Sequence, residues 1–223
     1  EEMPWLKTLY ASLEDFGARL GYKIEYSHFN KTDPGYLEHL TSIWAARGVR
    51  GILLGPFSKY YKTLPFPWER FAWVTIGASF DEPFLHHAGR DYATDISTAL
   101  DWLGMQGCRR PCFIEDSKRN RILKQHMLQA ALMHYQSVRP PRPPRPYYEL
   151  DTQKPRHFEA WLEANRPDGL ILPGLFAPKF NPFAKLMVTL PTVVLSPSAG
   201  ALKKPNMLSF TARYDVLGQI AVN

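Results

Sequence analysis

The sequence has few cysteines and no long apolar run. Only Cys108 and Cys112 occur among 223 residues, too few for a disulfide framework or a structural zinc site, so we expect reduced thiols in a cytoplasmic setting. No apolar run approaches the roughly 18 to 20 residues that a membrane span requires. The start, EEMPWLKTLY, has neither the basic front nor the apolar middle of a signal peptide. We therefore expect a soluble, cytoplasmic chain without a membrane partner.

Common signatures of α/β enzymes are also missing. The patterns Gly-x-Gly-x-x-Gly, the P-loop and the nucleophile elbow Gly-x-Ser-x-Gly do not occur. The adjacent histidines His86 and His87 lie on an expected extended segment, where neighbours point to opposite sides, so they are poor ligands for one metal ion and should be surface residues. Ser196-Pro197-Ser198 indicates a turn that ends a strand. We expect no enzyme activity, no metal and no cofactor.

The overall composition is that of an ordinary globular protein. With 45% hydrophobic residues, the chain can bury the core of one domain or of two coupled lobes. The formal charge of +6 argues only weakly for a nucleic-acid partner, because three positive charges lie in RPPRPPRP at 139–146. This run must be extended polyproline II. We favour a stiff solvated connector, and docking on an SH3-type groove is the alternative.

Apolar spacing alternates between the periods of helices and strands along most of the chain. This alternation implies parallel sheets with helices on both faces. Ligands of such sheets bind beyond the carboxyl ends of the strands, here in the loops after Leu54, Ile76, Ile114 and Leu172. The spacing predicts helices over 4–20, 34–47, 92–105, 121–135, 155–165 and from 215, and strands over 22–28, 51–55, 71–77, 111–115, 147–150, 169–172 and 192–195.

Several short stretches follow one another in a recognisable order. They are Pro4-Trp5-Leu6, VRGILL at 49–54, Asp91, GCRRP at 107–111, KQHMLQAAL at 124–132, RPDGLIL at 166–172 and Leu217-Gly218. In order and spacing the chain resembles the effector-binding domain of the LacI/GalR family of bacterial transcription regulators. The resemblance implies an α/β, two-lobed, periplasmic-binding-protein-like (type I) fold with parallel sheets flanked by helices and a ligand cleft between the lobes.

The resemblance also implies an organisation and partners. The N-terminal lobe would comprise residues 1–91 and 210–223, and the C-terminal lobe residues 92–209. The family's helix-turn-helix domain, which binds operator DNA, is absent from these residues, as are the first strand of one lobe and the final strand of the other, so we expect a fragment of a longer protein. The implied partners are a small-molecule effector, often a sugar or sugar derivative, operator DNA through the absent domain, and a second copy in a homodimer.

Three candidate ligand-binding residues lie in the expected first lobe. Trp5 and Leu6 stand where the family often has aromatic residues that stack on a sugar ring, and core packing at a helix start is the alternative. Ser58 follows Leu54-Gly55-Pro56-Phe57 and could donate to a ligand hydroxyl. The preceding Gly-Pro pair favours the alternative that Ser58 only begins a turn.

The remaining candidates lie near the lobe crossing and beyond it. Asp91 stands at a family Asp or Asn position and could accept from ligand hydroxyls, cap the following helix, or do both. Lys118 and Asn120 follow a predicted strand, where the family places polar ligand contacts. Lys124 occupies the position of a family arginine that clamps the effector. Lysine lacks the planar fork that grips two oxygens, so this difference weakens the match.

The sharpest departure from the family is Gly174-Leu175. The family usually has an Asn-Asp pair there, whose aspartate binds sugar hydroxyls, and leucine cannot accept a hydrogen bond. We therefore predict an effector that is anionic or partly apolar, or a cleft that no longer responds to the usual sugars. The predicted function is a ligand-sensing domain of a transcription regulator. The alternative is a solute-binding protein of a sugar transport system, which would have the same fold.

Overall fold

The computed structural model describes residues 4–29, 31–116, 126–137, 147–150, 155–172, 186–195, 206–210 and 212–223. The chain divides into unit 1, residues 1–90 and 213–223, and unit 2, residues 91–212. Asp91 and Phe210, which the resemblance assigned to the first lobe, lie in unit 2. The reason is structural, since Asp91 caps the first helix of unit 2 and Phe210 is the last residue of a strand in its sheet.

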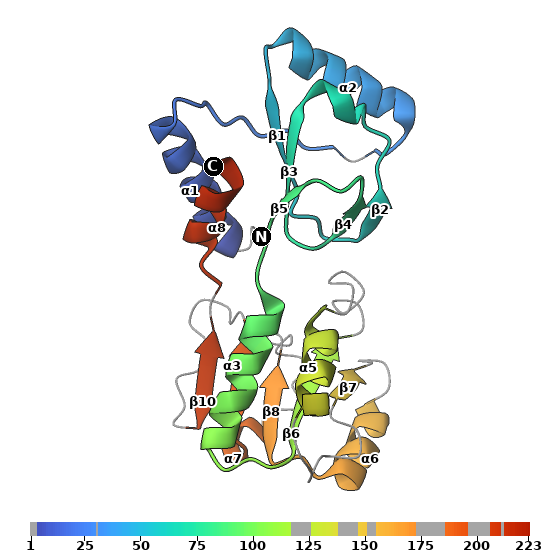
Figure 1. Cartoon of the computed structure of the whole chain (residues 1–223). Helices are drawn as coiled ribbons and strands as arrows, with labels where there is room; N and C mark the ends of the chain where they lie inside the picture. The colour runs from blue at the N-terminus through green and yellow to red at the C-terminus, as the bar shows by residue number, and fades with distance from the viewer. Residues whose placement is uncertain are drawn as a thin grey trace. The chain divides into compact units, whose positions relative to one another are not determined.

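The main sheet of unit 1 is parallel, with the strand order β1-β3-β5 (Figure 1). β1 covers Gly51–Leu54, β3 covers Ala72–Ile76 and β5 covers His86–Ala88. The first two confirm the apolar runs at 51–55 and 71–77 as strands. A separate parallel pair, β2 (Tyr61–Thr63) with β4 (Phe80–Glu82), was not predicted. Strands of three residues are too short to show an alternating pattern.

Helices cover both faces of this sheet. α1 (Pro4–Arg19) and α8 (Tyr214–Val222) pack against each other and cover one face, on which Leu53 of β1 lies. α2 (Pro34–Ala46) covers the other face, on which Ile52 lies. Successive residues of a strand point to opposite faces, so β1 contributes to both cores. All three helices confirm the predicted helical spacing.

The core beneath α2 is built mainly from aromatic rings. Their centroids lie 4.8 to 6.3 Å apart, mostly edge to face or tilted, which is the geometry that aromatic quadrupoles favour. The cluster consists of Phe29, Trp44, Phe57, Tyr61, Phe66, Trp68, Phe71, Trp73 and Phe80. It joins α2 to the long connection between β1 and β3.

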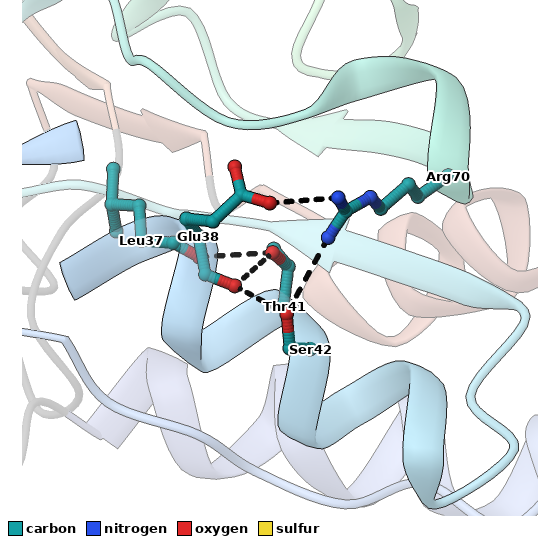
Figure 2. Close-up of polar contacts among 5 residues, drawn as sticks. All are labelled: Leu37, Glu38, Thr41, Ser42 and Arg70. Atoms are coloured by element: carbon teal, nitrogen blue, oxygen red, sulfur yellow. Dashed lines mark hydrogen bonds and ion pairs between the residues drawn. The ribbon is translucent and has the colours of Figure 1, made fainter. Parts of the chain in front are cut away.

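A polar contact closes the same interface at the surface (Figure 2). Arg70, at the end of the 3₁₀ helix η1 (Trp68–Arg70), donates from Nη2 to Glu38 Oε1 of α2 at 2.7 Å and from Nη1 to Ser42 Oγ at 3.5 Å. Ser42 and Thr41 in turn donate to the carbonyl oxygen of Glu38 at 2.9 Å. These contacts fix η1 against one side of α2.

The strand predicted over 22–28 is wrong. These residues are not paired with any described strand. Their alternation has another cause, because Ile24 and Tyr26 pack on α1. The centroid of the Tyr26 ring lies 4.7 Å from that of Tyr10. Glu25 points to the other side and forms an ion pair with Arg47 at 2.7 Å. An extended segment that lies on a helix shows the same period of two as a strand.

The sheet of unit 2 is parallel, with the order β10-β9-β8-β6-β7. Figure 1 labels β10, β8, β6 and β7 of this sheet. The predicted strands at 111–115, 147–150, 169–172 and 192–195 are confirmed, and β10 is additional. Strands β8 and β9 are buried at every residue, as expected for the centre of a parallel sheet with two covered faces. The bounds are β6 Pro111–Asp116, β7 Tyr147–Leu150, β8 Gly169–Leu172, β9 Thr192–Leu195 and β10 Met207–Phe210.

Two helix layers enclose this sheet. α3 (Tyr92–Met105) and α5 (His126–Ser137) pack together over one face, and α6 (Pro155–Asn165) with the short α7 (Leu186–Thr189) covers the other. α3 and α6 have the predicted bounds. The helix predicted over 121–135 is confirmed from His126 onward, and residues 121–125 lie outside the described part, as does the RPPRPPRP run. The predicted α/β fold with parallel sheets flanked by helices is confirmed.

The two cysteines are free thiols. Burial raises the pKa of Cys108 to about 11 and that of Cys112, at the start of β6, to about 12. Cys108 Sγ lies 3.2 Å from the carbonyl oxygen of Asp168. Within the described segments, no helix is both long and apolar enough to cross a membrane.

Candidate functional site

Three connections leave the carboxyl ends of the parallel strands in unit 1. We call them rim 1, which consists of residues 55–58 after β1, 77–79 after β3 and 87–90 at the end of β5. The register places Leu54 beside Thr75 and Ile76 beside Ala88, so the three strands end close together. Ligands of parallel α/β sheets bind at such ends.

Glycines allow the connections of rim 1 to approach each other. Gly55 has φ +101°, and a Cβ there would lie 2.9 Å from the carbonyl oxygen of Ile76. Gly77 has φ +81°, and a Cβ there would lie 3.8 Å from Cβ of Pro56. Both values lie in the left-handed region, which glycine adopts without the steric cost of a side chain. The connections after β1 and β3 are therefore in contact.

The side chain of His87 links the connection at the end of β5 to the connection after β3. Its Nε2 lies 3.0 Å from the carbonyl oxygen of Gly77, while the amide of Gly77 donates to the carbonyl oxygen of Ala88 at 2.9 Å. The ring also lies on Gly89, where a Cβ would be only 2.2 Å from Cε1 of the imidazole. His86 and His87 are both exposed, which confirms them as surface residues. Sequence spacing alone does not distinguish His87 from His86.

The predicted site residues of unit 1 occupy different surroundings. Ser58 is exposed in a bend of rim 1. Trp5 and Leu6 are half-buried on α1 and pack against the core that α1 forms with α8. The ring of Trp5 stacks on Tyr214, with centroids 5.0 Å apart and planes inclined by 28°. Both residues therefore pack against the core, as the alternative interpretation expects. Tyr214 covers one face of the Trp5 ring.

The corresponding edge of unit 2, rim 2, comprises the end of β6 and the first residues of α3 and α5. Asp91 caps α3: Oδ1 accepts from the amides of Ala93 and Thr94, both at 3.1 Å, and Oδ2 accepts from the Thr94 hydroxyl at 2.6 Å. The Thr94 hydroxyl, followed by its amide, lowers the pKa of Asp91. The capping role considered for Asp91 is thus confirmed, and its side chain remains exposed to solvent.

Two further features of rim 2 were not predicted. Glu115 is only 2% exposed near the end of β6, in a strand that is otherwise largely apolar. Tyr92 and His126, the first residues of α3 and α5, are in ring contact with centroids 6.3 Å apart. A carboxylate within a predicted buried strand was a visible signal, because charged residues are seldom fully buried. The Tyr92 contact joins segments distant in sequence, so spacing could not reveal it.

Four residues of the sequence-based prediction lie outside the described part. They are Lys118, Asn120, Lys124 and Leu175. Ser196–Ser198 lies there as well. For the described residues, no group of three or more His, Cys, Asp or Glu side chains has the arrangement that could hold a metal ion.

No family model matches the sequence, and no curated protein matches it either. The fold, in contrast, matches many solved structures. One is a regulatory protein of the LacI family from Chloroflexus aggregans, with 14% identity, a TM-score of 0.67 and coverage of 97% of this chain and 82% of that chain. Another is the Cra dual regulator from Pseudomonas putida in complex with fructose 1-phosphate, with 13% identity, a TM-score of 0.61 and coverage of 99% and 85%.

A third match is a LacI-family regulator from Enterococcus faecium with bound ribose, with 15% identity, a TM-score of 0.60 and coverage of 98% of this chain and 83% of that chain. The chain thus has the fold of the periplasmic-binding-protein-like regulatory domains. The resemblance to the LacI/GalR regulators that the sequence suggested is confirmed at the level of the fold.

Proposed function

We propose that this chain is the effector-binding domain of a LacI-type transcription regulator. The observation that carries the proposal is the match of nearly the whole chain, both units included, to regulatory domains of this family. In this role a small molecule shifts the equilibrium between two arrangements of the units, and so changes operator binding by a DNA-binding domain outside these residues. The active regulator is a cytoplasmic homodimer, and the domain catalyses no reaction.

Charge in unit 2 supports an anionic effector, such as a sugar phosphate or sugar acid. Residues 117–125 connect the carboxyl end of β6 to the start of α5. They contain four Lys or Arg residues and no Asp or Glu. Ligands of parallel sheets bind beyond the carboxyl ends of the strands, so cations in this connection raise the local concentration of anions. Fructose 1-phosphate, the ligand of the Cra structure, has this chemistry.

We assign contacts with this effector to residues of both units. Lys118 and Lys124 supply cations, and Asn120 supplies an amide that can donate and accept. Asp91 accepts from hydroxyls with the lone pairs that the cap leaves exposed. Contacts in unit 1 come from Ser58, Leu6 and the Trp5 ring face opposite Tyr214.

A thermal-shift screen tests the proposal, because a ligand that binds only the folded state raises the melting temperature. The panel contains neutral sugars, sugar acids and phosphorylated sugars. We expect a shift with acidic or phosphorylated sugars that is lost in Lys124→Ala and retained in Lys62→Ala, which removes an exposed lysine of β2. If no panel member shifts the well-folded protein, effector sensing is contradicted. Tight binding of an unmodified neutral monosaccharide would contradict the anionic class alone.

The alternative is a solute-binding protein that delivers its ligand to a transporter. The two functions predict different coding sequences ahead of Glu1. A helix-turn-helix encoded ahead of Glu1 supports the regulator. A signal peptide or lipid-anchored cysteine there supports the transport protein. Sequencing of the coding region ahead of Glu1 therefore separates the two.

A further inference from the structure

The imidazole of His87 in rim 1 is exposed but restrained. Exposed side chains ordinarily sample several rotamers, because nothing opposes rotation about their χ angles. Here the carbonyl oxygen of Gly77 lies 3.0 Å from Nε2. The ring also lies directly on Gly89, since a Cβ at that position would be 2.5 Å from Nε2 and 3.3 Å from Nδ1. The hydrogen bond and the Gly89 backbone together hold the ring in one orientation.

The contact with Gly77 also determines where the proton of the neutral ring lies. A carbonyl oxygen can only accept, so Nε2 must be the donor. In the neutral imidazole the other nitrogen, Nδ1, then carries a lone pair and can only accept. No donor from the described residues is bonded to Nδ1. His87 therefore offers an acceptor of fixed direction at the carboxyl edge of the sheet.

We propose that Nδ1 of His87 accepts a hydrogen bond from a hydroxyl group of the effector. This makes His87 a ligand-binding residue of unit 1 and assigns a polyhydroxylated ligand, a sugar or sugar phosphate, to rim 1. Small-molecule sites fix their ligands with a few well-placed polar groups, and an acceptor that is already oriented loses little entropy on binding. The inference rests on the proposed function, because it specifies a contact of the same effector.

His86 provides a matched control. It is an exposed histidine of the same strand, and its side chain points to the opposite side of the sheet from that of His87. Replacement by phenylalanine removes both ring nitrogens and keeps a planar ring in either position. His86→Phe and His87→Phe therefore make the same chemical change at two places, only one of which lies against Gly77 and Gly89.

The test is isothermal titration calorimetry of the wild type and both variants with fructose 1-phosphate, ribose and glucuronate as probes. For a probe that the wild type binds, we expect His87→Phe to weaken binding about tenfold and His86→Phe to change it by less than about twofold, as for the loss of one hydrogen bond. Equal affinity in the wild type and His87→Phe would overturn this inference alone. If the wild type binds neither these probes nor any member of the thermal-shift panel, this inference and the proposed function both fail.

Side-chain ¹⁵N NMR of the wild type tests the same contact without requiring that the variant folds. In the free protein we expect the His87 ring as the Nε2-protonated tautomer, and on saturation with the bound probe we expect the Nδ1 resonance to move as it accepts a hydrogen bond. The ring of His86 should show neither property. An Nδ1-protonated tautomer, or an Nδ1 resonance that does not respond to a bound probe, would overturn the proposal even if His87→Phe fails to fold.

Discussion

Gly218 of α8 lies directly against Ser12 of α1. A Cβ at position 218 would be 2.7 Å from Cβ of Ser12 and 3.1 Å from the backbone nitrogen of Leu13. The Ser12 hydroxyl donates to the carbonyl oxygen of Asp215, one turn before Gly218. Rotation of the Ser12 side chain cannot move its Cβ, so the two helices must separate to admit a larger residue.

We expect Gly218→Ala to lower the free energy of unfolding by about 1 to 3 kcal/mol, as for other overpacked sites. The close approach of α1 and α8 is the reason, since helix propensity alone favours alanine over glycine. Urea unfolding followed by circular dichroism measures the change.

Gly104 of α3 is the matched control for this substitution. It also lies within a helix, but a Cβ there would meet nothing within 4 Å. Gly104→Ala should therefore raise the free energy of unfolding by about 0.4 to 1 kcal/mol. Similar effects of the two substitutions would show that the contact with Ser12 is not what decides the result.

The cap formed by Asp91 predicts a pH-dependent contribution to stability. We expect Asp91→Ala to lower the free energy of unfolding at pH 7 by about 1 kcal/mol, the usual cost of losing an N-cap. Because hydrogen bonds from Thr94 lower the pKa of Asp91 below its ordinary value of 3.8 in the folded state, the charged cap stabilises the protein above that value. The contribution of the charged carboxylate to the free energy of unfolding is lost as the pH falls through the lowered pKa.

Urea unfolding at pH 7 and at about pH 3 measures this difference. The difference in the free energy of unfolding between the wild type and Asp91→Ala should be smaller at the lower pH. Asp101→Ala, which removes an exposed carboxylate from the middle of the same helix, should show no comparable loss at pH 7. A gap that widens toward low pH would contradict the assigned direction.

The two thiols should react slowly with DTNB in the native protein. With pKa values raised to about 11 for Cys108 and about 12 for Cys112, little thiolate is present at about pH 8, and only the thiolate attacks. The rate for Cys108, which is half-buried, should rise as the pH approaches its raised pKa. Stoichiometric reaction of both thiols in urea is the control, and rapid native labelling at pH 8 would contradict the burial described for them.

The ion pair of Glu38 with Arg70 should contribute little to stability. Both side chains are substantially exposed, 57% and 38% respectively. A double-mutant cycle with Glu38→Gln and Arg70→Gln should give a coupling of about 0.2 to 1 kcal/mol that decreases in high salt. In contrast, Phe66→Ala removes a buried ring at the centre of the aromatic cluster (5% exposed) and should cost about 3 to 5 kcal/mol. A coupling of several kcal/mol would contradict this ranking.

Helices and strands with regularly spaced apolar residues could be predicted from the sequence. Elements that depend on contacts between residues far apart in the chain could not. The helix at 92–105 and the strand at 169–172 have their predicted bounds because one is amphipathic and the other continuously apolar. The segment 22–28 was misassigned because packing on α1 gives the same alternation as pairing in a sheet. Sequence spacing carries no information about backbone partners.

The candidate site was only partly accessible from sequence for a related reason. Asp91 was recognisable as a cap because its partners lie two and three residues away. The restraint on His87 depends on Gly77, ten residues earlier in the chain, and on the parallel register that brings β5 beside β3. His86 and His87 are therefore indistinguishable until the fold is known.

Unit 2 is a single continuous stretch, whereas unit 1 is assembled from two stretches that flank it. The packing of α1 against α8 therefore joins residues about two hundred positions apart. During synthesis, the ribosome must complete all of unit 2 before α8 exists to cover Leu9 and Leu13 of α1. Until then the face of the sheet of unit 1 that α1 and α8 cover lacks α8, so we expect chaperones to bind the nascent unit 1.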